Sequence, residues 1–177
     1  MNDITLDRID RKILNLLQAD NQLPTKLLAQ KVNVSAPTAL RRVRTLREAG
    51  IIESDVAMLN PLALGLGLMV FVEVSLASQS DEQLRAFEQR MMSEPEVLQC
   101  YFVTGQYDYF LIVHVADMEA YYQFVRRVLS GTGGVRHFES KFPMRRVKFS
   151  TALAMDEKQP ELTLKLPPRP ARRARRT

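Results

Sequence analysis

The sequence has 177 residues, of which 46% are hydrophobic and 25% are charged, which is typical of one or two small globular domains. No apolar stretch approaches the roughly 20 residues needed to span a bilayer, and the polar, acidic start gives no signal peptide. A single cysteine, Cys100, excludes a disulfide framework within the chain. These features predict a cytoplasmic protein with no membrane partner.

The charge is distributed unevenly along the chain, whose net charge is +5. Residues 1–50 hold nine Lys/Arg against five Asp/Glu, residues 51–150 hold nine against twelve, and residues 151–177 hold seven against three. A basic first segment on a more acidic middle is typical of a nucleic-acid-binding domain joined to a domain with another purpose.

The first fifty residues predict three short helices. Asp7 is suited to cap a first helix that runs to about Ala19, since its apolar side chains follow helical spacing. A second helix starts at Pro24-Thr25, and Asn33 fits the tight turn after it because asparagine tolerates positive φ. Three helices with such a turn before the third form a tri-helical DNA-binding unit.

The third helix, between Ser35 and Gly50, is predicted to enter DNA. Ser35 is a suitable N-cap, Pro37 fits the first turn, and Gly50 stands at the C-cap. One face is apolar and consists of Ala36, Ala39, Leu40, Val43 and Leu46. The other face carries guanidinium and hydroxyl groups, which suit phosphates and guanine edges, although a solvated basic face is the alternative. The residues predicted to contact DNA are Ser35, Pro37, Thr38, Arg41, Arg42, Arg44 and Thr45.

The segment after Gly50 predicts a wing. Residues 51–53 and 56–59 have the character of two short strands around Ser54-Asp55, which would form a β-hairpin. Asp55 at its tip is unfavourable for the approach of a phosphate. Residues 1–59 are therefore expected to form a winged helix-turn-helix domain, followed by a linker over residues 60–67 that begins at Asn60-Pro61.

From Leu68 the apolar spacing changes to two, which is typical of a strand. Ser80 with Gln83 forms a capping box for a helix that stops before Pro95, and Asp117 caps a second helix. The expected strands cover residues 68–76, 97–103, 109–115 and 135–151. This order, β-α-β-β-α-β, predicts a ferredoxin-like domain over residues 68–152, so the fold class is α+β.

Both helices of such a domain cover one face of the sheet. The other face would expose tyrosine, phenylalanine and methionine side chains, so we expect it to be buried in a homodimer. Residues 153–177 contain four prolines and end in ARRARRT, which predicts a disordered tail. Its arginines could add non-specific phosphate contacts, or the tail could only increase solubility.

These elements, in this order, resemble the Lrp/AsnC (feast/famine) family of bacterial and archaeal transcriptional regulators over about residues 5–152. The stretches that carry the resemblance are LDRIDRKILNLLQAD, VSAPTALRRVRTLREAGII, LNPLALGL followed by VFVEVSL, VTGQYDYFLIV and GVRHFES. The resemblance implies a winged helix-turn-helix joined to a ferredoxin-like effector domain. It also implies homodimers that often assemble into tetramers or octamers, with a small effector, usually an amino acid, bound where dimers meet.

The family's effector site is built around the loop between the second and third strands of this domain. Here that loop is Gly105, Gln106, Tyr107, Asp108 and Tyr109. Its glycine turn exposes backbone N–H groups that can hold a carboxylate, and Asp108 can accept from an α-ammonium group. A tight hairpin without a ligand is the alternative, because glycine and aspartate are turn residues. The resemblance adds Met118 and Ser140 to the site.

The sequence departs from the family pattern at three positions, one in the effector loop and two in the third helix. Gln106 replaces an acidic residue that often follows the loop glycine, which leaves the charge preference for the ligand open. Arg41 and Arg47 stand where relatives commonly carry acids, so the third helix is unusually basic.

Two other functions compete with a regulator. An enzyme has little support, because His114, His137 and Cys100 lie on separate predicted strands and no metal-ligand spacing, P-loop or dinucleotide motif occurs. We therefore predict no catalytic residue, metal or cofactor. An architectural protein that binds double-stranded DNA without an effector is the second alternative. The sequence favours a sequence-specific, nucleoid-associated transcriptional regulator whose assembly or DNA binding responds to an amino acid.

Overall fold

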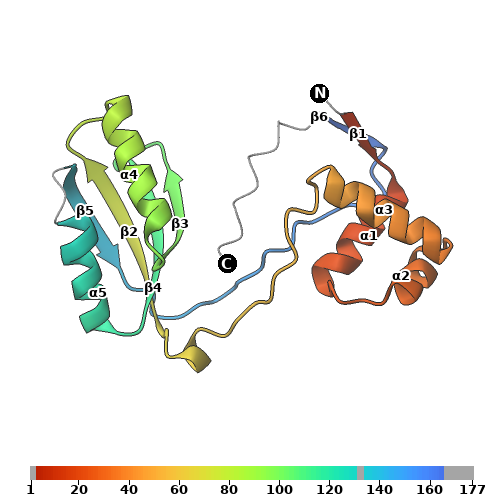
Figure 1. The fold of residues 1–177 in the computed structure, drawn as a ribbon, viewed down its shortest axis with the longest axis horizontal. Helices are drawn as coiled ribbons and strands as arrows, with labels where there is room; N and C mark the ends of the chain where they lie inside the picture. The colour runs from red at the N-terminus through yellow and green to blue at the C-terminus, as the bar shows by residue number, and fades with distance from the viewer. Residues whose placement is uncertain (1–2, 131–133, 166–177) are drawn as a thin grey trace. The chain divides into compact units, whose positions relative to one another are not determined.

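The computed structural model describes residues 3–130 and 134–165. They divide into two compact units, one of residues 3–57 with 149–165 and one of residues 58–130 with 134–148 (Figure 1). None of the described helices has the length and apolar character to cross a membrane.

The first unit consists of three helices and a two-stranded sheet. The helices, at the predicted positions, are α1 (Arg8–Ala19), α2 (Thr25–Val32) and α3 (Ala36–Glu48). The strands β1 (Asp3–Leu6) and β6 (Leu162–Lys165) pair antiparallel. The buried core joins side chains from β1 and all three helices, namely Leu6, Ile13, Leu14, Leu28, Val32, Val43 and Leu46.

The predicted caps of these helices are confirmed. The Asp7 carboxylate accepts from the backbone N–H of Asp10 (2.8 Å) and the Asp10 carboxylate accepts from that of Asp7 (3.3 Å), which closes a capping box on α1. Asn33 ends α2 in the left-handed region at φ 57°, and the Ser35 hydroxyl accepts from the backbone N–H of Thr38 at the start of α3. Local side-chain chemistry therefore fixes both ends of the turn that precedes α3.

The hairpin predicted over residues 51–59 is wrong, because no strand forms there. The backbone N–H groups of Ile51 and Ile52 both donate to the carbonyl of Leu46 and close the end of α3, so they cannot form a strand ladder. An ion pair between Arg47 and Asp55 (3.0 Å) follows. The sheet of this unit is instead the pair of β1 with β6.

The prediction of a disordered tail is also wrong for the segment before residue 166. Residues 162–165 form β6, and Met155 and Leu164 pack against the core of the three helices. Residues 166–177 of the predicted tail lie outside the described residues.

The second unit is a four-stranded antiparallel sheet in the order β3-β4-β2-β5. Its strands are β2 (Leu68–Leu76), β3 (Val97–Phe102), β4 (Tyr109–Val115) and β5 (Val135–Lys141). Its helices are α4 (Asp81–Ser93) and α5 (Met118–Phe124). Helix α5 continues into the π-helical turn η2 (Val125–Leu129), and the 3-10 turn η1 (Leu62–Leu64) precedes β2. This topology confirms the ferredoxin-like prediction. The last strand is shorter than predicted because Pro143 follows it and cannot donate to a ladder.

Both helices pack on one face of this sheet (Figure 1). Phe87 and Met91 of α4 and Tyr121 and Phe124 of α5 contact the alternate, fully buried side chains of β2 and β4. No element among the described residues of this unit covers the opposite face, and Phe71 and Phe110 stack on it with their ring centroids 5.7 Å apart. Tyr107, which lies just before β4, donates its hydroxyl to Glu139, which stands opposite Glu73 on this open face, so the loop around Tyr107 lies at the edge of that face.

Candidate DNA-binding helix and effector loop

The outer face of α3 is polar and exposed. Arg41, Arg44 and Thr45 are exposed, as are Ser35 and Pro37 at the start of the helix, while Thr38 is half-buried. The packed face is narrower than predicted and consists of Ala39, Val43 and Leu46. Ala36 and Leu40, which were assigned to that face, are exposed instead because the two other helices contact only one narrow stripe of α3.

Arg42 lies apart from this surface. Its Nη1 is 2.8 Å from Oδ2 of Asp7 and 2.8 Å from Oδ1 of Asp10, and its side chain is only 23% exposed. Burial raises the pKa of Asp7, but the backbone N–H of Asp10 and the Arg42 guanidinium outweigh it, so the net pKa is lowered. Burial also lowers the pKa of Arg42, and the two carboxylates more than compensate. Arg42 therefore ties α3 to the start of α1.

Arg44 is placed differently from Arg42. Its Nε is 2.7 Å from Oε1 of Glu48, and both side chains are largely exposed. Its pKa is raised by the hydrogen bond to Glu48. An exposed pair of this kind exchanges readily with water or a phosphate, because its net stabilisation is small. Arg41 and Arg44 are thus the guanidinium groups of the outer face that can approach a nucleic acid.

The predicted effector loop joins β3 to β4 through a tight turn. The backbone N–H of Val103 donates to the carbonyl of Asp108 (2.9 Å), and the N–H of Asp108 donates to the carbonyl of Val74 (2.9 Å). Gly105 has φ +127°, a conformation that L side chains rarely adopt. Gly105 and Gln106 are exposed, so the tip of the turn is open to a ligand.

Two residues of the predicted site are buried and already bonded. The carboxylate of Asp108, which is 8% exposed, accepts from the backbone N–H of Leu76 (2.7 Å) and from Nε2 of Gln79 (2.6 Å). Tyr109 is fully buried, and its hydroxyl donates to Oε1 of Glu88 (2.9 Å). Burial, followed by the bond to Glu88, raises the pKa of Tyr109. These two side chains hold the loop and β4 in place.

Tyr107 belongs to a charged cluster on the open sheet face that the sequence analysis missed. Its hydroxyl donates to Oε2 of Glu139 (2.6 Å), which raises the pKa of Tyr107 to about 12. Nζ of Lys141 donates to Oε2 of Glu73 (2.6 Å) and lies 5.9 Å from the centre of the Tyr107 ring. The hydrogen bond from Tyr107, and then the charge of Lys141, lower the pKa of Glu139. We call Glu73, Tyr107, Glu139 and Lys141 the sheet-face cluster.

The remaining two predicted residues do not join this cluster. The Ser140 hydroxyl lies 2.6 Å from that of Tyr121 and stands opposite Val72, on the helix-covered side of the sheet. Met118 is the first residue of α5 and is 58% exposed. Within one chain, the predicted effector residues therefore line no common cavity among the described residues.

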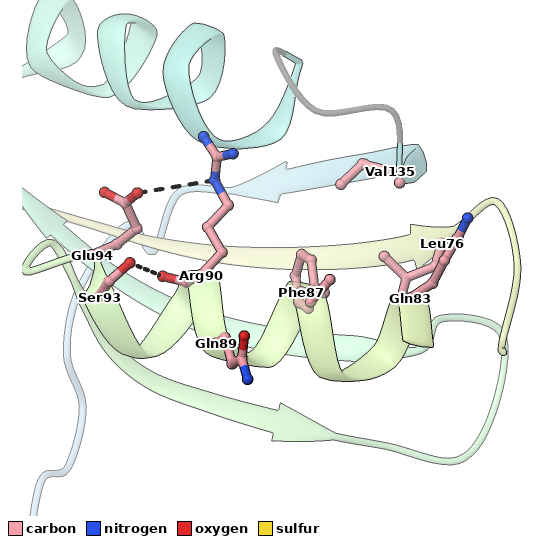
Figure 2. Close-up of a pocket in the computed structure, with 10 residues that line it drawn as sticks. Leu76, Gln83, Phe87, Gln89, Arg90, Ser93, Glu94 and Val135 are labelled. Atoms are coloured by element: carbon pink, nitrogen blue, oxygen red, sulfur yellow. Dashed lines mark hydrogen bonds and ion pairs between the residues drawn. The ribbon is translucent and has the colours of Figure 1, made fainter. Parts of the chain in front are cut away.

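One cavity of about 730 Å³ lies between α4 and the adjoining ends of β2 and β5 (Figure 2). Leu76, Phe87 and Val135 form its apolar wall. Its basic group, Arg90, donates to the carbonyl of Arg127, and its Nε lies 3.9 Å from Glu94. Through its bond to the Arg127 carbonyl, Arg90 links α4 to η2. None of the predicted effector residues lines this cavity.

Comparison with known proteins decides the family. A family model described as winged helix-turn-helix DNA-binding matches residues 6–53. A second, described as the Lrp/AsnC ligand binding domain, matches residues 69–153. The chain belongs to the Lrp/AsnC family.

Relatives in this family match most of the chain. A helix-turn-helix-type transcriptional regulator of Haemophilus influenzae is 43% identical over 151 residues, which is 85% of this chain and 90% of the relative. A leucine-responsive regulatory protein of Rhizobium meliloti is 40% identical over 145 residues, or 82% and 93% of the two chains. The crystal structure of a Neisseria meningitidis transcriptional regulator in complex with L-Met has 34% identity and a TM-score of 0.82, covering 85% of this chain and 97% of its own.

These matches confirm several predictions at once. As a member of the Lrp/AsnC family, the chain is a DNA-binding transcriptional regulator with a domain that binds a small ligand. It is not an enzyme, since its relatives are regulators of transcription. The helix-turn-helix match contains α1, α2 and α3, which identifies the tri-helical unit as the part that binds DNA.

Proposed function

We propose that this Lrp/AsnC regulator docks α3 on duplex DNA and senses an amino acid beside the loop from Gly105 to Tyr109. Ligand binding would change how copies of the chain assemble and so how their α3 helices are spaced along DNA. In this proposal residues 1–59 bind DNA, residues 60–67 form the linker, and residues 68–152 bind the effector and oligomerise. A regulator that acts on the chromosome would be cytoplasmic and nucleoid-associated.

The exposed outer face of α3 supports the DNA contacts. Arg41 and Arg44 would bind phosphates or guanine edges, with hydroxyl and backbone contacts from the remaining exposed positions, Ser35, Pro37, Thr38 and Thr45. Arg42 was predicted as a further contact, but its bonds to Asp7 and Asp10 favour a positioning role.

The observation that carries the effector proposal is the mixed charge beside the open turn. An amino acid has an ammonium group and a carboxylate, which fit Glu73 or Glu139 and Lys141 respectively. The exposed turn at Gly105 adds backbone N–H groups next to this cluster. The solved Neisseria meningitidis relative, a complex with L-Met, supports an amino acid as the ligand class.

The open sheet face supports a homodimer. Phe71 and Phe110 stack on it, and Ile112 lies on the same face by strand alternation, next to Tyr101, which is 51% exposed. A contiguous apolar surface of this kind is typical of a protein interface. A second copy covering it would also bring a second sheet-face cluster close by, and pairing of dimers into tetramers or octamers would complete the ligand site.

The test is thermal unfolding of the protein with each of the twenty common amino acids in turn. A ligand at 100 times its Kd stabilises the folded state by about 2.7 kcal/mol, so a binder raises the unfolding midpoint clearly. Lys141→Gln should abolish the shift, whereas Arg85→Gln on the exposed side of α4 should leave it unchanged. Asp108→Ala is a poor probe, since it also removes the acceptor for the Leu76 N–H.

An architectural DNA-binding protein is the second candidate. The observation that favours it is that Asp108 and Tyr109 are already bonded within the chain and, in the part of the chain that the structure describes, share no cavity with Met118 or Ser140. It predicts no midpoint shift with any amino acid, together with intact DNA binding. A shift with one chemical class that Lys141→Gln removes would reject it.

A further inference from the structure

Leu40 on α3 is a large apolar side chain that lies outside the core. Of the large apolar side chains on α1, α2 and α3, only Leu27 and Leu40 are exposed, at 40% and 56%. Leu40 lies one turn after Ala36 and one turn before Arg44, so these three side chains form a row along the helix. Ala36 is exposed as well. We call Ala36 and Leu40 the apolar row.

The apolar row lies in the first half of α3, which spans Ala36–Glu48. When the third helix of such a unit enters a major groove, its N-terminal residues contact the edges of the bases. Arg41 follows Leu40 directly, Arg44 lies on the next turn, and both are exposed. The row is therefore bordered by the two guanidinium groups that we propose to dock on DNA. An apolar row in this setting fits a polyanion that has apolar groups on its surface.

The hydroxyl groups on this side of α3 are already bonded within the helix. Those of Ser35 and Thr38 lie 2.7 Å apart, and the Thr45 hydroxyl donates to the carbonyl of Arg41 (3.1 Å). No asparagine or glutamine, the side chains that pair with adenine, occurs in α3, and guanidinium groups select guanine. An apolar contact with the methyl group of thymine is the remaining way for this helix to recognise an A·T pair in the major groove.

We propose that Leu40, supported by Ala36, contacts the 5-methyl group of a thymine in the major groove and so determines the base pair at that position. Among the four bases of DNA, only thymine presents a methyl group on this edge. The inference rests on the proposed docking of α3. Burial of one methyl group contributes a factor of about four to affinity.

The test is a double-mutant cycle that pairs the leucine side chain with the methyl group. Binding sites are first selected from random-sequence duplexes with the wild-type protein. In a selected duplex, each thymine is then replaced in turn by deoxyuridine, which lacks the methyl group and keeps its base pairing. The affinities of wild type and Leu40→Ala are measured at one fixed salt concentration, because phosphate contacts depend on salt.

We expect a position at which deoxyuridine costs the wild type about fourfold in affinity and costs Leu40→Ala nothing. Because Leu40 is exposed, Leu40→Ala should keep the wild-type unfolding midpoint. Leu27→Ala, at the exposed leucine of α2, is the matched control. It should lose affinity for the deoxyuridine duplex as the wild type does.

Two results of the cycle would overturn the inference. A wild type that binds every deoxyuridine duplex as tightly as the parent duplex recognises no methyl group. Equal losses in wild type and Leu40→Ala would assign the methyl contact to another side chain. Arg44→Ala separates these results from a failure of the proposed function. If Arg44→Ala weakens binding, α3 docks as proposed and only the role of Leu40 is rejected; if it binds as the wild type does, the docking fails and this inference with it.

A second measurement moves the methyl group to a different base. At the position that the cycle identifies, the T·A pair is replaced by a C·G pair that carries either cytosine or 5-methylcytosine, whose methyl group lies on the same edge of the major groove. The wild type should bind the 5-methylcytosine duplex about fourfold more tightly, whereas Leu40→Ala should bind both duplexes equally. Equal affinities in the wild type would attribute the preference for thymine to the deformability of the duplex, and would overturn the proposal.

Discussion

Arg42→Ala should destabilise the DNA-binding unit and spare the ferredoxin-like unit. The substitution removes two charge-assisted contacts of 2.8 Å, to Asp7 and to Asp10, from a position that is 23% exposed. It also leaves two neighbouring carboxylates without their shared cation. Contacts of this kind contribute about 1.5–3 kcal/mol when buried, so about 2 kcal/mol is expected here after partial screening by water.

The aromatic residues of the chain allow the two units to be followed separately. All five tyrosines lie between residues 101 and 122, so tyrosine fluorescence reports on the ferredoxin-like unit, whereas far-ultraviolet circular dichroism reports on both. With a urea m-value near 1 kcal/mol/M for so small a unit, the urea midpoint of the early part of the dichroism transition should fall by about 2 M. The fluorescence transition should stay in place.

Arg44→Ala is the matched control, because its partner Glu48 is exposed. It should leave both transitions unchanged and lower the salt slope of DNA binding by about 1, while Arg42→Ala keeps the wild-type slope under conditions where it is folded. A dichroism transition that Arg42→Ala does not move, or one that Arg44→Ala moves equally, would refute the positioning role. DNA affinity unchanged in both variants would show that α3 is not the docking helix.

Three further predictions concern single residues. Because the pKa of Asp7 is lowered in the folded state, its contribution to stability is present above about pH 4 and is lost as the pH falls through the folded value. Asp7→Asn should therefore flatten that part of the acid-unfolding curve. An unaltered curve would contradict the lowered pKa. Gly105→Ala should cost the ferredoxin-like unit about 1–2 kcal/mol in urea unfolding, because Gly105 has φ +127° and the open space around it leaves backbone strain as the cause. The control Gly134→Ala, also in open space, should be nearly neutral. Equal costs in the two variants would exclude backbone strain. Desolvation by the surrounding side chains, followed by the charge of Glu88, raises the pKa of the exposed Cys100 thiol to about 11, so a thiol reagent at pH 8 should react more slowly with the folded protein than in urea, and equal rates would contradict the raised pKa.

Much of the fold follows from signals that lie within a few residues of each other. Asp7, Ser35 and Asp117 cap their helices as predicted, because a carboxylate or hydroxyl needs only the N–H groups of the next turn. The alternation of apolar residues from Leu68 likewise predicts β2. The order of these local elements is enough to indicate a helix-turn-helix followed by a ferredoxin-like domain.

The elements that the sequence did not indicate depend on distant partners. β1 and β6 are four residues each and lie more than 150 residues apart, so neither carries a local strand pattern. The sheet-face cluster requires the register of β5 on β2, which sets Glu139 opposite Glu73. Arg42 looked like a DNA contact because its helical position is half exposed, and only the packing of α3 on α1 reveals its two carboxylate partners.

The pairing of β1 with β6 makes the DNA-binding unit discontinuous in sequence, with the whole ferredoxin-like unit inserted between its two parts. During synthesis, α1, α2 and α3 leave the ribosome first, but Arg11 must wait for carbonyl groups that are translated about 145 residues later. At roughly 5–20 residues per second this delay is of the order of ten seconds. The inserted unit can therefore fold first, and a nascent chain completes its DNA-binding unit only after residues 149–165 have been translated.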